Sequence, residues 1–159
     1  MLLIHGADEF IPLPWDLNGY YTTGLSYEAM SDVTVLRAPK DELRTAMGNN
    51  TWLSHEVLNQ AVNIIAVYTQ RIQTLEYRTA RERIVAEILY LAERFGEHVG
   101  SEVHINAPIT HQDIADSINM NRETASRAFE MLFDEGLMGQ KDHLFVVRDI
   151  SKLRAAIAN

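Results

Sequence analysis

The sequence predicts an α+β protein with short strands in its N-terminal third, a long helix in the middle, and a C-terminal domain of helices followed by a hairpin. Three observations support this prediction. Proline, glycine and asparagine interrupt aromatic and β-branched runs over residues 10–39, apolar residues recur at helical spacing over residues 58–75, and two short amphipathic segments meet at a tight turn within residues 109–133.

The N-terminal third is the least regular part of the chain. Aromatic and β-branched residues favour strands over residues 10–39, and the Pro, Asn-Gly and Gly interruptions favour turns between them. We therefore expect short strands and turns here, in a first region that spans residues 1–50.

The middle region, residues 51–78, is expected to be one helix with an apolar seam in which spacings of three and four residues alternate. This is the a/d pattern of a coiled coil, and a single helix with such a seam needs a partner. The alternative is a helix buried within its own domain. The seam consists of Leu58, Ala61, Ile65, Tyr68, Ile72 and Leu75.

The C-terminal domain, residues 79–159, is expected to begin with another amphipathic helix, which Gly96 ends. A polar stretch separates this helix from the preceding one, so we place a hinge at about residues 77–79. The apolar face of the helix consists of Ile84, Val85, Ile88, Leu89, Ala92 and Phe95.

Residues 109–133 predict two helices joined by a tight turn. Thr110 and Asp113 have the spacing of a capping box at the start of the first helix, which would bury Ile114, Ala115 and Ile118. The turn falls at Asn119, because asparagine tolerates left-handed backbone angles, and Asn121 is expected to cap the second helix.

The second of these helices has two distinct faces. Ala125, Ala128, Phe129 and Leu132 recur at the spacing of a buried face. Arginine can bind the O6 and N7 atoms of guanine, and glutamate can accept a hydrogen bond from cytosine, so the opposite face has the chemistry for contacting DNA bases. The alternative is a solvated helix with intrahelical salt bridges. The polar face consists of Arg122, Glu123, Ser126, Arg127 and Glu130.

A hairpin is expected directly after this helix. Gly136 suits the left-handed position that ends a helix, and residues 137–149 predict a strand, a polar turn near residues 140–142 and a second strand over residues 144–147. A hairpin in this place is a wing, and Lys141 at its tip is expected to contact phosphate. The domain is therefore predicted to be a winged helix-turn-helix.

These motifs resemble the C-terminal domain of the Crp/Fnr family of transcription regulators. The family's I-T-x-Q-x-I-A helix matches residues 109–115, its R-E-T-x-S-R recognition helix matches residues 122–127, and its G-L-I motif matches Gly136-Leu137-Met138. The resemblance implies base contacts by Arg122, Glu123 and Arg127. The resemblance also implies contacts with the phosphate backbone of DNA by Thr110, His111, Gln112, Asn121, Ser126 and Lys141. His111 stands where relatives often have a basic residue, which weakens that contact or makes it depend on pH.

The resemblance extends upstream of the DNA-binding domain. In the family a long helix pairs with its twofold mate, which implies a homodimer whose recognition helices lie about 34 Å apart and bind a pseudo-palindromic site. Residues 27–37 and the helix expected after Pro39 resemble the last strands and closing helix of the family's effector-binding β-roll. Residues 1–50 are thus interpreted as a partial β-roll, which lacks the first half. RNA polymerase is a further partner that the resemblance implies.

No cofactor is expected. The Gly-Glu pair and Arg-Ser/Thr-Ala run of the family's cyclic-nucleotide binders are missing, so cyclic-nucleotide sensing is not supported. The chain has no cysteine, which excludes a cysteine-bound iron–sulfur cluster and any disulfide. The six histidines are scattered without metal-site spacing.

Composition indicates a small cytoplasmic protein. Hydrophobic residues make up 47% of the 159 residues, enough for a core, and no apolar run reaches the length of a membrane span. The first apolar stretch is interrupted by His5, Asp8 and Glu9, so no secretory leader is expected. The net charge of −8 predicts weak nonspecific binding to DNA, because many DNA-binding chains are basic.

Two other functional classes compete with DNA binding. The start LLIHG and the segment Gly24–Glu28 resemble parts of an α/β-hydrolase, but Glu28 stands where the nucleophile elbow needs glycine, so no enzyme is expected. The second alternative is a dimeric winged-helix module that binds proteins, or a modulator that pairs with a full-length relative, without contacting DNA itself.

Overall fold

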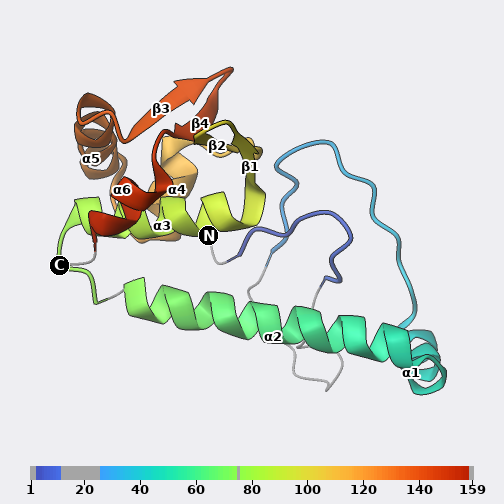
Figure 1. The fold of residues 1–159 in the computed structure, drawn as a ribbon. Coiled ribbons are helices and arrows are strands. Elements are labelled where there is room, and N and C mark those ends of the chain that lie inside the picture. The colour runs from blue at the N-terminus through green and yellow to red at the C-terminus, as the bar shows by residue number, and fades with distance from the viewer. Residues whose placement is uncertain (1–2, 12–25, 75, 158–159) are drawn as a thin grey trace. The chain divides into compact units, whose positions relative to one another are not determined.

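The computed structural model describes residues 3–11, 26–74 and 76–157. Within these residues the chain divides into two compact units (Figure 1). One unit contains residues 4–71, and the other contains residues 72–157 with Leu3. No helix in the described part of the chain is long and apolar enough to cross a bilayer.

Helices α1 (Lys40–Asn49) and α2 (Thr51–Thr74) dominate the first unit. Helix α1 begins directly after Pro39, where the sequence predicts a helix, and carries Asp41 and Glu42 in its first turn, where the helix dipole favours negative charge. The Gln60 side chain of α2 fixes the N-terminal segment through two hydrogen bonds. Its Oε1 accepts from the Phe10 amide at 2.8 Å, and its Nε2 donates to the Phe10 carbonyl at 2.7 Å.

The strands predicted for residues 27–37 are not formed. This segment contains no helix or strand, and Val33, Val35 and Leu36 are exposed, with Leu36 at 94% exposure. The described part of residues 1–50 therefore contains no strand of the expected β-roll; residues 12–25 lie outside the described residues, and the interpretation of residues 1–50 as a partial β-roll stays a prediction. The physical reason is pairing: a strand becomes stable only when neighbours satisfy its backbone groups and cover its apolar face.

The second unit begins with helix α3 (Ala80–Phe95), close to the range that the sequence predicts. Thr79 and Glu82 form a capping box that fixes its start, although this box was not part of the prediction. Five of the six predicted face residues, Ile84, Val85, Ile88, Leu89 and Ala92, are buried. The helix ends at Gly96, where a Cβ atom would lie only 2.1 Å from the carbonyl oxygen of Ala92.

A four-stranded antiparallel sheet completes the unit, with strand order β1-β2-β4-β3. The hairpin of β1 (Gly96–Val99) and β2 (Glu102–Ile105) was not predicted, whereas the hairpin of β3 (Met138–Lys141) and β4 (Leu144–Val147) is the predicted wing. The buried side chains of the sheet include Val103, Ile105, Met138, Phe145 and Val147.

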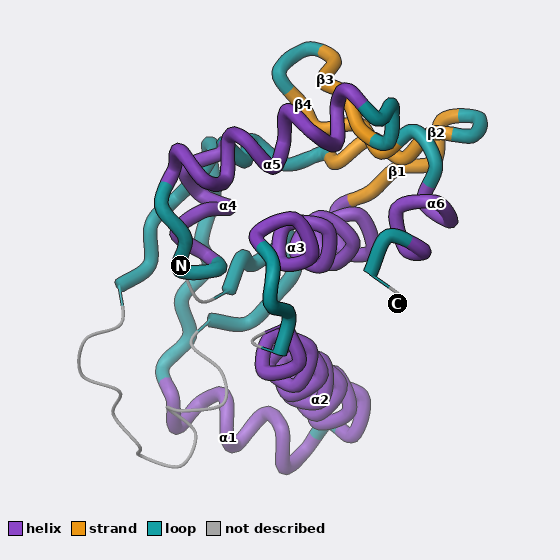
Figure 2. The backbone as a smooth tube through the Cα atoms, turned by 90° about the vertical axis from the view of Figure 1, so that its left-hand side faces the viewer, coloured by secondary structure: helices purple, strands orange, loops and turns teal. Residues whose placement is uncertain are grey.

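The remaining helices are α4 (His111–Ser117), α5 (Arg122–Asp134) and α6 (Ile150–Ala155). Helix α3 packs against α5 and α6, and α4 packs against α5. In Figure 2, α5 and the β3–β4 hairpin lie along the upper side of this unit, with α3 below them. The prediction of an α+β fold that contains a winged helix-turn-helix is therefore confirmed.

Candidate nucleic-acid interface

The turn between α4 and α5 has the local geometry that the sequence predicts. The Thr110 hydroxyl accepts a hydrogen bond from the Asp113 amide at 3.2 Å, and Asp113 Oδ2 accepts from the Thr110 amide at 2.8 Å. Asn119 has a φ of 52°, the left-handed conformation expected there. The Asn121 side chain accepts from the Thr124 amide at 2.8 Å and so caps α5.

Helix α5 presents the two faces that its sequence pattern predicts. Ala125, Ala128, Phe129 and Leu132 are buried. The small alanines allow close packing on the elements beneath, which fixes α5 in place. The face on the other side remains exposed at Arg122, Glu123, Arg127 and Glu130, while Ser126 is half-buried.

The charged side chains on the exposed face of α5 are unpaired within the described residues. Arg122, Glu123 and Arg127 form no hydrogen bond or ion pair with another described side chain, although Glu123 and Arg127 are four residues apart. The intrahelical salt bridges of the alternative interpretation are therefore not formed. The face offers two guanidinium groups and a carboxylate to an external partner.

Other cations of the same unit are paired with carboxylates. The pairs are Arg81 with Glu135, Lys152 with Asp149 at 3.5 Å, and Arg154 with Glu93 at 2.8 Å. Arg122, Arg127 and Lys141 form no such pair in the described part of the chain. Positive charge that forms no ion pair in the described structure thus includes these three side chains on α5 and the wing, together with Arg78 and Arg83 near the start of α3.

The residues predicted to contact phosphate differ in how free their donor groups are. Both the amide and the hydroxyl of Thr110 donate to Asp113 Oδ2, at 2.8 and 2.6 Å. Gln112 donates from Nε2 to Asp116 Oδ1 at 2.7 Å and remains exposed. Asn121 uses only its oxygen for capping, so its amide nitrogen remains available for a phosphate oxygen.

His111 lies in an aromatic cluster. Its ring is stacked on Phe129, with centroids 4.3 Å apart and an interplanar angle of 6°, and on Phe145 at 5.3 Å and 20°. Nε2 is buried and has no hydrogen-bond partner in the described structure. Burial lowers the pKa of His111, Arg122 lowers it further, and Glu130 opposes the shift. The neutral ring is therefore a packing element between α4, α5 and β4. A DNA contact by His111 stays a prediction.

The wing turn lies slightly later than predicted. Gln140 and Lys141 belong to β3, and the two residues between the strands are Asp142 and His143, with φ of 51° and 66°. Two positive φ values in a two-residue loop identify the mirror-image turn that matches the twist of paired strands. Lys141 is exposed at the end of β3, beside this turn.

Sequence reasoning gave no role to Arg148, the residue that follows β4. Arg148 is exposed, and its guanidinium lies over Gly139 of β3. The only signal in the sequence was a lone arginine directly after an apolar strand, and nothing in that pattern indicates where its side chain lies.

The apolar stripe of α2 forms a second candidate surface. Leu58, Ile65 and Ile72 are exposed at 60%, 62% and 66%. Ala61 and Tyr68 of the predicted seam are half-buried, and Leu75 lies outside the described residues. The buried residues of α2 are Val57 and Ile64, which lie off the seam.

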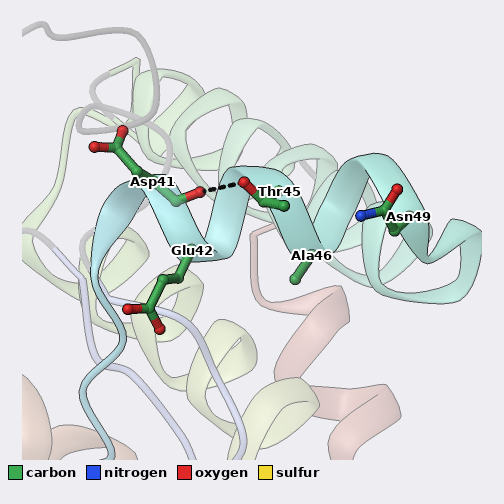
Figure 3. Close-up of a pocket in the computed structure, with 5 residues that line it drawn as sticks. All are labelled: Asp41, Glu42, Thr45, Ala46 and Asn49. Carbon is green, nitrogen blue, oxygen red and sulfur yellow. Dashed lines mark hydrogen bonds between the residues drawn. The ribbon is translucent and has the colours of Figure 1, made fainter.

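A depression lies along α1. As Figure 3 shows, all five of its labelled lining residues come from one helix, and Thr45 Oγ1 donates to the Asp41 carbonyl at 2.9 Å. It is open to solvent, and a single helix face supplies its lining. No cluster of three or more histidine, cysteine or acidic residues suited to a metal ion occurs within the described ranges.

Comparison with known proteins agrees with this geometry. Residues 82–156 match the family described as the Crp-like helix-turn-helix domain. The chain is 30% identical over 99 residues to the global nitrogen regulator of Nostoc, covering 62% of this chain and 44% of the relative. It is 28% identical over 151 residues to the nitrogen fixation regulation protein FixK of Azorhizobium caulinodans, covering 92% and 61%. The chain thus spans about half the length of these curated relatives.

Solved structures show the same fold. The structure of FixK2 from Bradyrhizobium japonicum superposes with a TM-score of 0.62 at 22% identity, covering 76% of this chain and 59% of the other. A CooA mutant from Carboxydothermus hydrogenoformans gives a TM-score of 0.66 at 15% identity, covering 74% and 55%. At these identities the likeness establishes the fold.

Proposed function

We propose that this chain, whose residues 82–156 match the Crp-like helix-turn-helix domain, is a transcription regulator of the Crp/Fnr family and that it binds a pseudo-palindromic DNA site as a homodimer. Its relatives are named as regulators, one of them as a CRP-like cAMP-activated global transcriptional regulator, and none of these names is that of an enzyme. DNA binding of this kind places the protein with the chromosome, in the cytoplasm. No cofactor is part of the proposal.

The observation that carries the proposal is the unpaired polar face of α5. Arg122, Glu123 and Arg127 project from a helix that is capped at Asn121 and anchored by a buried alanine-rich face. A guanidinium can make a bidentate hydrogen bond to guanine, and a carboxylate can accept from cytosine. We assign base contacts to these three side chains and backbone contacts to the flanking donors, above all Asn121 and Lys141.

Dimerisation is supported by the exposed stripe of α2. Leu58, Ile65 and Ile72 leave most of their apolar surface in water, and burial of such a side chain stabilises an interface by about 1.5–3 kcal/mol. Pairing of two α2 helices along this stripe would supply a twofold axis. A twofold dimer sets its recognition helices about 34 Å apart, one turn of B-DNA.

The acidic composition is compatible with this proposal. Salt-dependent attraction to DNA depends on the cations that touch phosphates rather than on the net charge of the chain. The net charge is −8, and the ion pairs of Arg81, Lys152 and Arg154 with their carboxylates add nothing to it, because each pair is neutral. The cations on α5 and the wing remain available.

The test is selection of a duplex from random DNA, followed by fluorescence anisotropy of the purified chain with that duplex. We expect one twofold-symmetric motif. Arg122→Ala and Arg127→Ala should each cost about 1–3 kcal/mol of specific binding. Arg154→Ala is the matched control, because that arginine is paired with Glu93 on another surface. Equal affinity of all variants for the selected duplex, or no enriched motif, would contradict DNA-base contact by α5.

A second candidate is a dimeric winged-helix module that binds proteins or modulates a full-length relative. The net charge of −8 favours it, because an acidic chain is a poor nonspecific DNA binder. The same selection separates the two proposals: the module would enrich no motif while remaining dimeric. Contact with RNA polymerase is a further proposal, and it is compatible with both the DNA-binding regulator and the protein-binding module.

A further inference from the structure

Arg148 is held in a defined position on the wing. Its backbone amide donates to the Leu137 carbonyl at 3.0 Å, which fixes the residue beside the start of β3. Its guanidinium then lies over Gly139, so that a Cβ atom on Gly139 would be 3.3 Å from both Nε and Nη2. The missing side chain at position 139 therefore leaves the space in which the guanidinium rests.

This guanidinium has no partner inside the described structure. It forms no hydrogen bond or ion pair with any described residue, and the residue is exposed. A guanidinium carries five donors in a planar fork that matches phosphate oxygens. Arg154, six residues later, has the same chemistry but is paired with Glu93 at 2.8 Å.

The position of Arg148 places it beside Lys141. Gly139 and Lys141 are two residues apart on β3, and alternate residues of a strand point to the same face. The Arg148 guanidinium and Lys141 thus share one face of the wing, about 7 Å apart along the strand. Duplex DNA carries one negative charge per about 1.7 Å of its axis, so two cations at this separation can both contact phosphates.

We propose that Arg148 is a phosphate-binding residue of the wing, positioned by Gly139, and that its ligand is the phosphodiester backbone of duplex DNA. This inference rests on the proposed function and adds a contact that extends the interface from α5 to the base of the wing. Arg148 would then join Arg122, Arg127 and Lys141 as cations through which this acidic chain contacts DNA.

A purely structural role for Arg148 makes a different prediction. Val146 points to the same face as Gly139, because the two residues are paired in adjacent strands, and it is only 4% exposed. If Arg148 serves only to cover the wing, Arg148→Met keeps the apolar stem and should leave DNA binding unchanged. If it binds phosphate, Arg148→Met should weaken binding while the thermal midpoint stays that of the wild type.

The experiment is fluorescence anisotropy of the full chain with the selected duplex and a scrambled duplex, over a series of salt concentrations. We expect Arg148→Met to weaken binding to both duplexes alike and to reduce the slope of log K against log salt by about 0.9, the value for one lost phosphate contact. Gly139→Val, which keeps the charge but fills the space below the guanidinium, should shift the slope in the same direction. Arg154→Met, which removes a paired arginine, should leave the slope unchanged.

The outcomes separate this inference from the proposed function. A wild-type slope in a folded Arg148→Met variant would overturn the inference, and if Arg122→Ala still lost specific binding, the proposed function would stand. Loss of specific binding to the selected duplex alone in Arg148→Met would also overturn it, since a phosphate contact carries no sequence information. No binding of either duplex by the wild type would overturn both.

Discussion

His111 shows how one side chain can link the parts of the DNA-binding domain. Its ring contacts Phe129 of α5 and Phe145 of β4, while its backbone begins α4. Because burial and the nearby Arg122 lower its pKa, the ring remains neutral at pH 7 and packs as an aromatic plate. The orientation of the wing relative to the recognition helix therefore depends on an uncharged imidazole.

This environment predicts a pH dependence of stability. The pKa of folded His111 lies below its ordinary value of 6.5, so the unfolded chain binds more protons at and just below that pH. The free energy of unfolding should therefore fall as the pH drops from neutral through this window. His111→Phe keeps the stacking and removes the titration, and should show a smaller fall.

Urea unfolding of both proteins, at about pH 7.5 and about pH 5.5 on either side of the ordinary histidine pKa, measures the difference. The comparison between variants cancels the other titrating groups. The same pH-induced loss in His111→Phe as in the wild type would contradict the role given to His111.

The wing turn gives a second prediction at the scale of single residues. Asp142 and His143 both have positive φ, which is costly for a side chain larger than glycine, and histidine tolerates it less well than asparagine or glycine. His143→Gly should relieve this strain and stabilise the domain by about 0.5–1 kcal/mol. Urea unfolding measures the change in the free energy of unfolding. Gly136→Ala is the control in the opposite direction, because it places a side chain at a φ of 69° and should destabilise the domain. A destabilised His143→Gly variant would contradict the turn geometry.

Single residues were predicted well wherever the rule that governs them is local. Thr110, Asn119, Asn121 and Gly136 all have the capping or left-handed role that their residue types indicate. The stacking of His111 could not be predicted in this way, because its aromatic partners come from α5 and β4 and meet it only in the folded domain. Arg148 was missed for the same reason.

At the scale of elements, the sequence predicted helices with strong periodicity and missed short elements without it. Helices α3, α4 and α5 and the wing lie where the pattern placed them. The four-residue strands β1 and β2 and the one-and-a-half-turn helix α6 are too short for periodicity to distinguish them from loops. Helix α2 ends at Thr74 rather than at residue 78. The apolar seam does not define this end, because local backbone geometry determines where a helix stops.

The start of α5 allows helix capping and phosphate binding to be separated. Asn121→Ala removes the side chain that accepts from the Thr124 amide, and should cost about 1 kcal/mol of stability as well as DNA affinity. Asn121→Asp keeps an equally good cap but replaces the free amide donor by a second acceptor oxygen. We therefore expect Asn121→Asp to have wild-type stability and weakened DNA binding.

Thermal unfolding and anisotropy on the same samples measure the two effects. Wild-type DNA affinity in Asn121→Asp would show that Asn121 acts only as a cap. Asn121→Ser, which caps without an amide or a charge, is the control that separates the loss of the donor from the repulsion between a carboxylate and phosphate.

At the scale of the whole molecule, the two compact units have different tasks under the proposal. The unit of residues 72–157 contains the helix-turn-helix and the wing, and the cations assigned to DNA contact are Arg122, Arg127, Lys141 and Arg148. One protomer therefore has a small number of contacts with DNA. Affinity for a long site then depends on joining two such domains, which is the task given to the apolar stripe of α2.

Disruption of this stripe should separate folding from operator binding. Ile65 is 62% exposed in the single chain, so Ile65→Arg costs little within a protomer but places a charge in the proposed interface. We expect a folded monomer by sedimentation and a large loss of affinity for the full palindrome. Asn63→Arg, an exposed position off the stripe, is the charge-matched control and should remain dimeric.

The decisive comparison is between the full palindrome and a duplex that contains one half-site. In the wild type, the second half-site is bound as an intramolecular event at high effective concentration, so the full site should be bound far more tightly than the half-site. In Ile65→Arg the two duplexes should be bound almost equally, because each protomer binds alone. A monomeric Ile65→Arg that still prefers the full palindrome as strongly as the wild type would remove α2 pairing from the proposal, and a dimeric Ile65→Arg would place the interface elsewhere.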